Sequence, residues 1–365
     1  MYSFEPNEEQ LMLVETVGKY AENDLRTASH EMEEQREIPV KLINKGWELG
    51  LLQASIPEAY GGFGERSAVT SVLAVEEMAF GDLAGTLGVM APALFAIPIL
   101  LGGSEEQKNT YLPGIVEGEW TPYTAGLIEY TFDFDPNALK TKAVLRGSDY
   151  LLDGEKAFVP FAKEANALLI YANLDGKTQG FIVPQGAAGV TISDERENLM
   201  GLNALPMYRV RLEGVKVPTA NRLGGASGHD FEPVLASMQL ASASAAVGVA
   251  KASFEYSKNY AKDREAFGVK IAQKQAIAFM LAEMATEIEA MRLLTWEAAW
   301  MLDNGKSDAF HQAYLACTGA ADMVLMVTDR GVQILGGHGY IREHQVELWL
   351  RNGRGFAMLT GIAII

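Results

Sequence analysis

The sequence predicts an α+β protein of three parts: an N-terminal helical domain over residues 1–120, a middle antiparallel β-barrel or sandwich over residues 121–228, and a C-terminal helical bundle over residues 229–365. Three observations predict this order. Apolar residues recur at helical spacing in the first and last thirds, whereas the middle third has short alternating runs broken by turn residues. The length of 365 residues also suits two or three structural units.

The composition excludes some classes of protein. The chain is 48% hydrophobic and 21% charged, with a net charge of −17 and a pI near 4.8, which argues against nucleic-acid binding. A small anionic ligand would therefore need locally placed Arg or Lys. Cys317 is the single cysteine, so we expect no internal disulfide and a reducing compartment. The acidic start has no signal-peptide pattern, so we expect a cytoplasmic protein.

One uncharged stretch, residues 83–104, is long enough to cross a membrane. Pro92, Pro98 and several glycines interrupt it, and no basic flank follows. We therefore expect a buried pair of helices and no membrane span.

Helix signals dominate the N-terminal part. Residues 7–10 (NEEQ) and 104–107 (SEEQ) have capping-box spacing. Leu11, Val14 and Val17 then give one apolar face of a first helix.

A turn-rich break spans Pro57 to Gly64. Gly62 and Gly64 begin like a dinucleotide-binding fingerprint, but Ser67 stands where a third small residue should follow, and no strand precedes them. We interpret this segment as a turn between structural units.

The middle part reads as short strands separated by Asp153-Gly154, Asp175-Gly176 and Glu213-Gly214, which predict turns. Close spacing of several strands favours a small antiparallel barrel or sandwich. The expected strands are residues 139–144, 150–156, 167–171, 180–183, 189–192 and 208–212.

The C-terminal part contains three long helical patterns, over residues 235–262, 271–302 and 307–335. Three glycines within Gly336 to Gly339 end the third pattern and allow the backbone to approach a ligand closely. His338 and His344 are six residues apart across this turn, so we expect no metal site.

Two segments closely resemble signatures of the FAD-dependent acyl-CoA dehydrogenases. They are residues 263–268 (DREAFG) with Gln275 downstream, and residues 333–340 (QILGGHGY). The resemblance covers nearly the whole chain, because residues 57–64, 105–113 and 215–218 match further family segments in the right order. The chain is identified as a member of this family on these motifs.

The resemblance implies an N-terminal helical domain, a middle β-domain and a C-terminal four-helix bundle that builds a dimer or tetramer. It implies that one subunit helps to hold the FAD of its neighbour. Arg264 is suited to the pyrophosphate and Phe267 to packing on a ring, and the glycine loop offers backbone donors. The expected FAD-binding residues are Arg264, Phe267, Gln275, Gln333, Gly336, Gly337 and Gly339.

The sequence departs from the family at the catalytic base. The family's usual Glu, in a Glu-Gly-Thr motif, falls on Thr360, and the alternative position early in the first C-terminal helix falls on Met238, followed by Gln239. Neither residue can remove a proton near neutral pH. We therefore expect no catalytic residue at either place.

The flavin-contacting segments of the β-domain also depart. The family's Trp-x-Thr/Ser aligns with residues 158–160 (FVP), where Pro160 has neither hydroxyl nor backbone donor. The family's Thr-Glu-Pro-x-x-Gly-Ser-Asp loop aligns with residues 125–135, which we expect to be two residues longer, with Asp135 kept.

These features predict the base-less subunit of a heteromeric acyl-CoA dehydrogenase. Its expected partners are a homologous catalytic subunit with which it shares FAD, an acyl-CoA substrate and an electron-transferring flavoprotein. A homomeric flavoenzyme with a base relocated to Glu129, Asp133 or Asp135 is a competing interpretation. The sequence also leaves open a flavin oxidase or monooxygenase on the same fold, and a scaffold without flavin.

Overall fold

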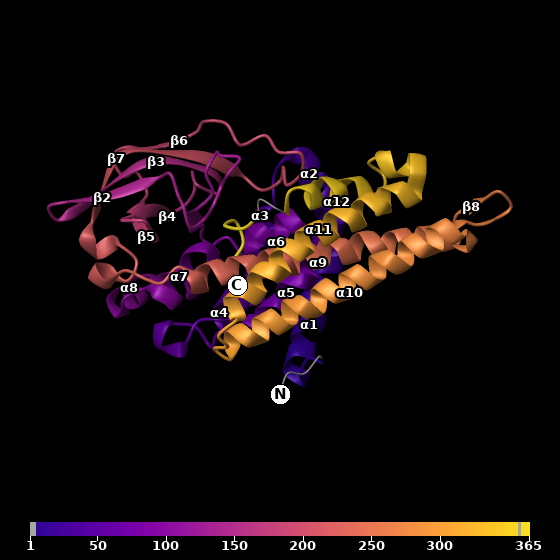
Figure 1. The fold of residues 1–365 in the computed structure, drawn as a ribbon, viewed down its shortest axis with the longest axis horizontal. Coiled ribbons are helices and arrows are strands. Elements are labelled where there is room, and N and C mark those ends of the chain that lie inside the picture. Colours follow the sequence, from indigo (N-terminus) through magenta and orange to yellow (C-terminus); the bar gives the residue numbers. More distant parts are fainter. Residues whose placement is uncertain (1–4, 357–358) are drawn as a thin grey trace.

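The computed structural model describes residues 5–356 and 359–365. A sheet domain lies at one side of a long helical body, and a thin hairpin projects from the opposite end of that body (Figure 1). The predicted fold class is confirmed: helical segments come first, the sheet follows, and long helices end the chain.

The N-terminal helices begin as the sequence predicted. Both capping boxes form, because Asn7 Oδ1 accepts the Gln10 N–H at 2.8 Å and Ser104 Oγ accepts the Gln107 N–H at 3.3 Å. The helices are α1 (Glu8–Tyr20), α2 (Arg26–Gln35), α3 (Val40–Trp47), α4 (Leu51–Ala54), α5 (Ala68–Gly81), α6 (Leu83–Val89), α7 (Ala93–Gly102) and α8 (Glu105–Val116), with a π-helical turn η1 (Ala21–Leu25) between α1 and α2.

The uncharged stretch forms the expected buried helix pair. Helices α6 and α7 are bent by 52° relative to each other at a break that contains Pro92, and both lie mostly in the core. In the described part of the chain, one helix, α9 (Glu232–Asp263), is long and apolar enough to cross a membrane. Its apolar window is 94% buried inside the protein, where it forms the central helix of the body.

The glycines of the 57–64 turn are required by packing. A Cβ atom on Gly62 would lie 1.9 Å from the Ile56 carbonyl oxygen, and one on Gly64 would lie 2.2 Å from that of Ala54. Helix α4 and a 3₁₀ turn, η2 (Glu58–Tyr60), precede these glycines. The turn therefore folds back on its own backbone, as a connection between helices.

The middle domain is one curved sheet of seven strands in the order β1-β4-β2-β3-β7-β6, with β5 paired to β4. Most neighbours are antiparallel, as predicted, but β1 and β2 both pair with β4 in parallel, because the chain crosses over between them. The strands are β1 (Thr124–Gly126), β2 (Lys142–Arg146), β3 (Asp149–Pro160), β4 (Ala167–Leu174), β5 (Lys177–Pro184), β6 (Val190–Ile192) and β7 (Met207–Pro218).

Two of the three predicted turns are irregularities within long strands. Gly154 lies inside β3 and Gly214 inside β7, and the register between these strands shifts between Leu152 and Gly154. Asp153 Oδ1 accepts the Gly214 N–H at 2.7 Å, which holds the two irregularities together. The prediction of turns there was wrong, whereas Asp175-Gly176 does form the tight turn between β4 and β5.

The C-terminal domain consists of three long helices and a short one. Helix α5 of the N-terminal domain packs along α9 and α10. The fourth helix of the expected bundle has only nine residues. The long helices are α9, α10 (Gln275–Asp303) and α11 (Ala309–Leu335), followed by a 3₁₀ turn, η6 (Gly336–Tyr340), and α12 (Val346–Arg354).

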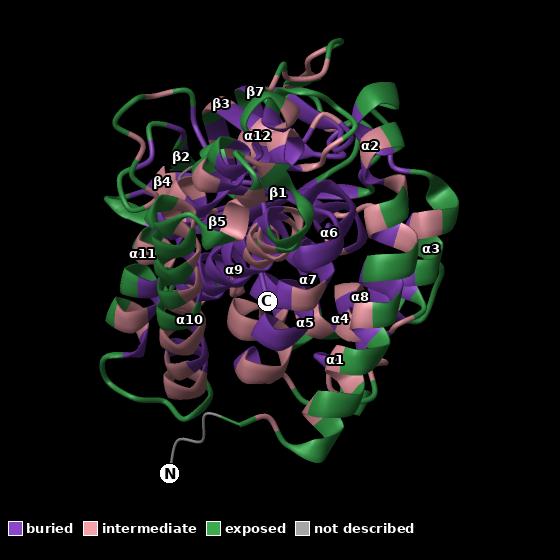
Figure 2. Cartoon of the chain, turned by 90° about the vertical axis from the view of Figure 1, so that its right-hand side faces the viewer, coloured by how far each residue is buried: buried purple, intermediate pink, exposed green. Residues whose placement is uncertain are grey.

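Burial is uneven among these helices. Helix α9 is enclosed, while α10 and α11 show intermediate and exposed residues on their outer faces (Figure 2). The core therefore lies along α5, α6, α7 and α9.

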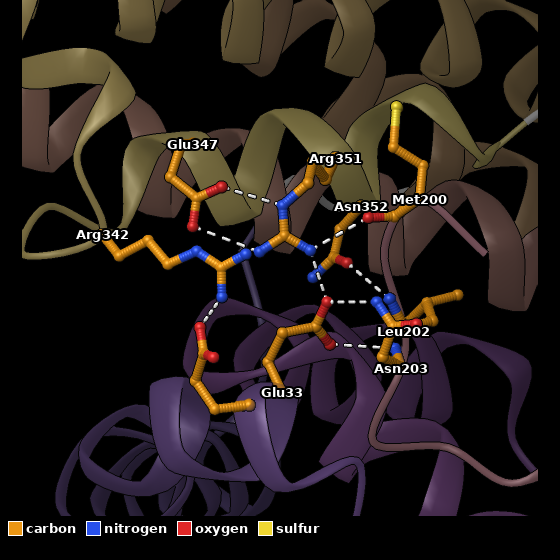
Figure 3. A network of polar contacts seen from close by, with 9 residues as sticks. Glu33, Met200, Leu202, Asn203, Arg342, Glu347, Arg351 and Asn352 are labelled. Carbon is orange, nitrogen blue, oxygen red and sulfur yellow. Dashed lines mark hydrogen bonds and ion pairs between the residues drawn. The ribbon is translucent and has the colours of Figure 1, made fainter. Parts of the chain in front are cut away.

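An arginine on α12 joins the three domains. Arg351 donates to Glu33 of α2, to Glu347 at 2.8 and 3.1 Å, and to the Met200 carbonyl oxygen at 2.9 Å (Figure 3). Its neighbour Asn352 accepts the backbone N–H of the loop residue Leu202 at 3.0 Å. These contacts fix α12 against both other domains.

A buried carboxylate caps α6. Asp82 Oδ1 accepts the Gly85 N–H at 2.7 Å, and its residue is 5% exposed. Burial raises the pKa of Asp82 to about 7, although the bond from Gly85 and the Arg26 charge act in the opposite direction. The folded state therefore favours the protonated form, and the stability that this supplies is lost as pH rises from about 4 to 7.

Replacing Asp82 by Asn should stabilise the protein at pH 8 by about 1–3 kcal/mol and change it little at pH 4, because Asn keeps the cap acceptor without a buried charge. Urea denaturation at both pH values measures this. Asp24→Asn, on a partly exposed carboxylate paired with Lys45, is the control. A loss of stability at pH 8 in Asp82→Asn would contradict the assignment.

Candidate functional site

A large cleft lies between the middle domain and the C-terminal helices. It has a volume of about 890 Å³. The loop of residues 128–136 and Phe158 line it on the sheet side, and α9, α11 and the C-terminal segment line it on the helical side. The helical side consists of Gln239, Tyr314, Cys317, Thr318, Ala321, Asp322, Phe356 and Thr360.

The two positions expected for a base hold no carboxylate. Thr360 lines the cleft, and its Oγ1 lies 3.6 Å from the Cys317 sulfur. Met238 is fully buried in the core, while the next residue, Gln239, reaches the cleft wall. Burial raises the pKa of the Cys317 thiol, so it is no nucleophile at neutral pH.

Glu129, one of the relocated-base candidates, is held in a buried ion pair. Its Oε1 accepts from Lys156 Nζ at 2.7 Å, and its two oxygens accept the backbone N–H groups of Lys140 and Thr141. Burial alone would raise the pKa of Glu129, but the Lys156 ammonium and the hydrogen bonds lower it below its ordinary value. Burial lowers the pKa of Lys156 to about 8, so both groups are charged near pH 7.

Glu129 lies in the loop of residues 125–135, for which the sequence predicts two residues more than the family motif. Its role in this chain is to fix the loop to β3 through Lys156.

The other candidates for a relocated base face solvent. Asp133 is exposed and paired with Lys140 at 3.0 Å, and Asp135 accepts the Asn137 N–H at 2.8 Å in a local turn. Asp322 is the further carboxylate among the described residues of the cleft wall, one helical turn beyond Thr318 on α11. Asp322 was not among the predicted residues, although its spacing from Cys317 and Thr318 on one helix face is a signal that the sequence contains.

The segment expected to contact a flavin ring has an unusual backbone. Phe158 has φ = 53°, a left-handed conformation that costs energy in a bulky residue, and it lies within the register shift between Lys156 and Val159 where β3 pairs with β7. Its ring centroid lies 5.5 Å from that of Tyr130, which also lines the cleft on the sheet side. Pro160 ends β3 without a backbone donor.

Residues of the Arg-x-x-Phe-Gly signature form the projecting hairpin. Arg264 ends α9, and strands β8 (Glu265–Ala266) and β9 (Val269–Lys270) follow. Phe267 and Gly268 make the turn, both with positive φ, and the Phe267 side chain is 94% exposed. Gln275, also exposed, begins α10 beside the hairpin.

The glycine loop lies at the same end of the helical body. Tyr260, on the last turn of α9, contacts His338 of η6 through its hydroxyl and Nδ1, 2.6 Å apart. Gly336 has φ = 59° and ψ = −127°, which only glycine adopts readily, and a Cβ on Gly337 would meet open space. Gln333 is exposed just before this loop, and Gly339 is buried against Val332.

The structure places the predicted cofactor residues at one end of the helical body, away from this chain's own cleft. The hairpin and η6 lie at the end of the helical body away from the sheet (Figure 1). The exposed Arg264, the exposed ring at the hairpin tip and the open backbone at Gly337 fit the phosphates and rings of a dinucleotide such as FAD. Pro160 offers neither a hydroxyl nor a backbone N–H at the place where the sequence predicts the segment that contacts the flavin.

No metal site accompanies these residues in the part of the chain that the structure describes. It holds no group of three or more His, Cys, Asp or Glu placed to bind a metal ion.

Three domain families match this chain in order. They are the acyl-CoA dehydrogenase N-terminal domain over residues 7–119, the middle domain over residues 126–215 and the C-terminal domain over residues 232–363.

Relatives of full length show the same likeness. A probable acyl-CoA dehydrogenase from Bacillus subtilis (strain 168) is 34% identical, covering 96% of this chain and 94% of that protein. A caffeyl-CoA reductase–Etf complex subunit from Acetobacterium woodii is also 34% identical, covering 97% and 95%. The solved butyryl-CoA dehydrogenase from Megasphaera elsdenii superimposes with a TM-score of 0.88 at 29% identity, covering 99% of this chain and 96% of that chain.

The helical–β–helical fold and its cleft define a protein of the flavin-dependent oxidoreductase class. Within that class, the chain belongs to the acyl-CoA dehydrogenase family.

Replacing Lys156 tests whether the buried ion pair of Glu129 and Lys156 stabilises the fold. Lys156→Met leaves Glu129 charged and unpaired, and should cost about 3–5 kcal/mol of unfolding free energy at pH 7. The double variant Glu129→Gln/Lys156→Met should recover most of that loss. Because the pKa of Glu129 is lowered on folding, the stability it contributes is present above its ordinary pKa and is lost as pH falls through the folded value.

Urea denaturation at pH 7 and pH 4 checks this, and Lys140→Met is the control. It breaks the exposed pair with Asp133, so it should cost less than about 1 kcal/mol. Equal losses in Lys156→Met and Lys140→Met would show that the buried pair does not hold the loop.

Proposed function

We propose that this chain is the non-catalytic subunit of a heteromeric FAD-dependent acyl-CoA dehydrogenase, and that it completes the FAD site of a homologous catalytic subunit. One observation carries the proposal. The residues suited to FAD lie at the end of the helical body that is away from this chain's own cleft, while that cleft has Thr360 in place of a base. A residue set that points outward is useful only to another subunit.

The charge distribution supports an anionic ligand at the hairpin end. The chain has a net charge of −17, yet residues 258–274 hold five basic and two acidic residues. Arg264 and Lys274 lie on either side of the hairpin, and Lys274 Nζ lies 5.8 Å from the Phe267 ring centroid. This local positive charge suits the pyrophosphate of FAD.

The outer face of α10 supports assembly with another chain. The helix has 29 residues, of which only six are buried. Its exposed side carries alanines and Phe279, which is 58% exposed, together with the exposed Glu283, Glu287 and Glu289, and Leu315 on the neighbouring α11 is 40% exposed. A face that combines apolar and acidic side chains is compatible with a subunit interface.

In the proposed assembly, the catalytic subunit and this chain have different roles. The catalytic subunit would supply the carboxylate that removes the α-proton of the acyl-CoA, and FAD, when bound, would supply the hydride acceptor for the β-carbon, so that the assembly would form the 2,3-enoyl-CoA. Arg264, Phe267, Gln275, Gln333 and the glycine loop of this chain bind and orient that FAD. We propose an electron-transferring flavoprotein as electron acceptor, in keeping with the name of the Acetobacterium relative, and a cytoplasmic location.

One observation favours a second candidate, a homomeric dehydrogenase with a relocated base. Asp322 lines the cleft and is exposed. In that case Asp322→Asn in the isolated chain should abolish dehydrogenation of acyl-CoA while FAD stays bound. Glu129 does not serve this role, because its two oxygens are occupied by Lys156 and by two backbone donors.

Expression alone and together with a homologous catalytic chain tests the proposal. The isolated chain should purify without stoichiometric FAD and should not oxidise acyl-CoA, whereas the mixture should be yellow and active. Absorbance at the flavin band and dye-coupled acyl-CoA oxidation measure both. Stoichiometric FAD and turnover in the isolated chain would refute the subunit role.

Two substitutions in the mixed assembly test separately the residues suited to FAD and the residue at the expected position of the base. Arg264→Ala should lower FAD retention by roughly tenfold or more, because one charge-assisted contact to phosphate is lost. Thr360→Ala should change neither FAD content nor turnover. Arg211→Ala, on an exposed arginine of β7 paired with Glu213, is the control. Loss of turnover with intact FAD in Thr360→Ala would contradict the assignment.

A further inference from the structure

A smaller pocket, the α12 pocket, lies between the loop of residues 199–202 and α12 with the segment that follows it. It has a volume of about 310 Å³, and Phe158 borders both this pocket and the large cleft. Thr360 lines the large cleft, whereas Leu359 and Ile362 line the α12 pocket. The C-terminal segment therefore presents Thr360 to one space and its apolar neighbours to another.

The inner wall of the α12 pocket is apolar. Met207 of β7 and Leu359 are each 2% exposed, and Ile362 is 4% exposed. Burial of hydrocarbon against such side chains is the main source of affinity in small-molecule sites. The volume lies at the lower end of the range for these sites, about 300 to 1,000 Å³, so the ligand must have a short apolar body.

Hydrogen bonds hold the walls of the pocket in place. Asn352 accepts the Leu202 N–H at 3.0 Å, and Arg351 donates to the Met200 carbonyl oxygen at 2.9 Å (Figure 3). Leu202 has φ = 58°, so it shares with Phe158 a left-handed backbone that bulky residues rarely adopt. Conformations of this kind cluster at ligand sites. The pocket is thus formed before a ligand arrives.

Two arginines line the pocket, and they differ in their partners. The charge of Arg351 is balanced by Glu33 and Glu347. Arg354 is exposed at the rim, and no residue in the described part of the chain forms an ion pair or a hydrogen bond with its guanidinium. A guanidinium is always charged and can bind a carboxylate through two parallel hydrogen bonds. Arg354 is therefore available to an anionic group on a ligand.

We propose that the α12 pocket binds a small amphipathic carboxylate, whose apolar body lies against Met207, Leu359 and Ile362 and whose carboxylate is bound by Arg354. Each methylene of the body gains roughly fourfold in affinity as it is buried. A neutral ligand with the same body lacks the contact with Arg354, and an inorganic anion lacks the apolar contacts. The site goes beyond the proposed sharing of FAD and requires no partner subunit.

Isothermal titration calorimetry of octanoate and of 1-octanol with the full-length chain at pH 7, where octanoate is ionised, tests this proposal. The wild-type chain should bind octanoate. Arg354→Met should weaken octanoate about tenfold and change 1-octanol less than about twofold, because only the charge-assisted contact is lost. Arg211→Met, on an exposed arginine outside the pocket, is the control and should change neither.

Filling the pocket provides an independent variant. Gly355 lines it in a right-handed helical conformation, and of the described atoms a Cβ there would come within 4 Å only of the Asn352 carbonyl oxygen, at 3.5 Å. Gly355→Phe should therefore fold and prevent binding of both ligands. Gly355→Leu replaces it if circular dichroism shows that it does not fold. Thr318→Phe, on an exposed residue of the large cleft, is the matched control and should leave both affinities unchanged.

Several outcomes overturn the proposal. They are a wild-type chain that does not bind octanoate, and an octanoate affinity that is unchanged in Arg354→Met or in the folded Gly355 variant. Loss of octanoate binding in folded Thr318→Phe would place the ligand in the large cleft instead. Competition between FAD and octanoate in the wild-type chain would assign the pocket to a flavin and would also overturn the proposal.

This readout is independent of the subunit role. An isolated chain that oxidises acyl-CoA, and whose octanoate binding responds to Arg354→Met and Gly355→Phe as expected, would remove the subunit role and leave the pocket standing. FAD and activity that appear only in the mixture, together with no octanoate binding to the isolated chain, would do the reverse.

Discussion

The Arg351 guanidinium is the contact on which the arrangement of the three domains depends. It satisfies two carboxylates, Glu33 of the first domain and Glu347 of its own helix, and the Met200 carbonyl of the second domain. Burial alone would lower the pKa of Arg351, but the two carboxylates raise it, so the charge is permanent.

Local features of the sequence were enough to predict most elements. The helical periodicity located the three long C-terminal helices within a few residues, and both capping boxes formed as expected. The Asp175-Gly176 pair also made the tight turn that its residue types favour. Such features depend on neighbours within one or two turns of the chain, which is why the sequence shows them directly.

The features that failed or were missed depend on distant partners. Gly154 and Gly214 look like turn residues, but β3 and β7 pair across both of them, with Asp153 bonded to Gly214. The buried pair of Glu129 and Lys156 joins residues 27 apart, and Arg66 reaches the Ile365 carbonyl over 299 positions. In the candidate site, the resemblance to family motifs was enough to predict the residues suited to FAD. Their separation from the chain's own cleft becomes visible only in the fold, where the hairpin that follows Arg264 lies at the opposite end of the helical body.

The exposed hairpin affects how long an unassembled copy of this chain would persist in the cell. Phe267 is held at the tip of a two-stranded turn with 94% of its surface in water, and Phe279 adds a second exposed ring on α10. A copy without a partner would present both rings to chaperones, proteases and other unassembled copies. In the proposed assembly the partner subunit would cover these rings, so copies without it would be prone to removal or aggregation.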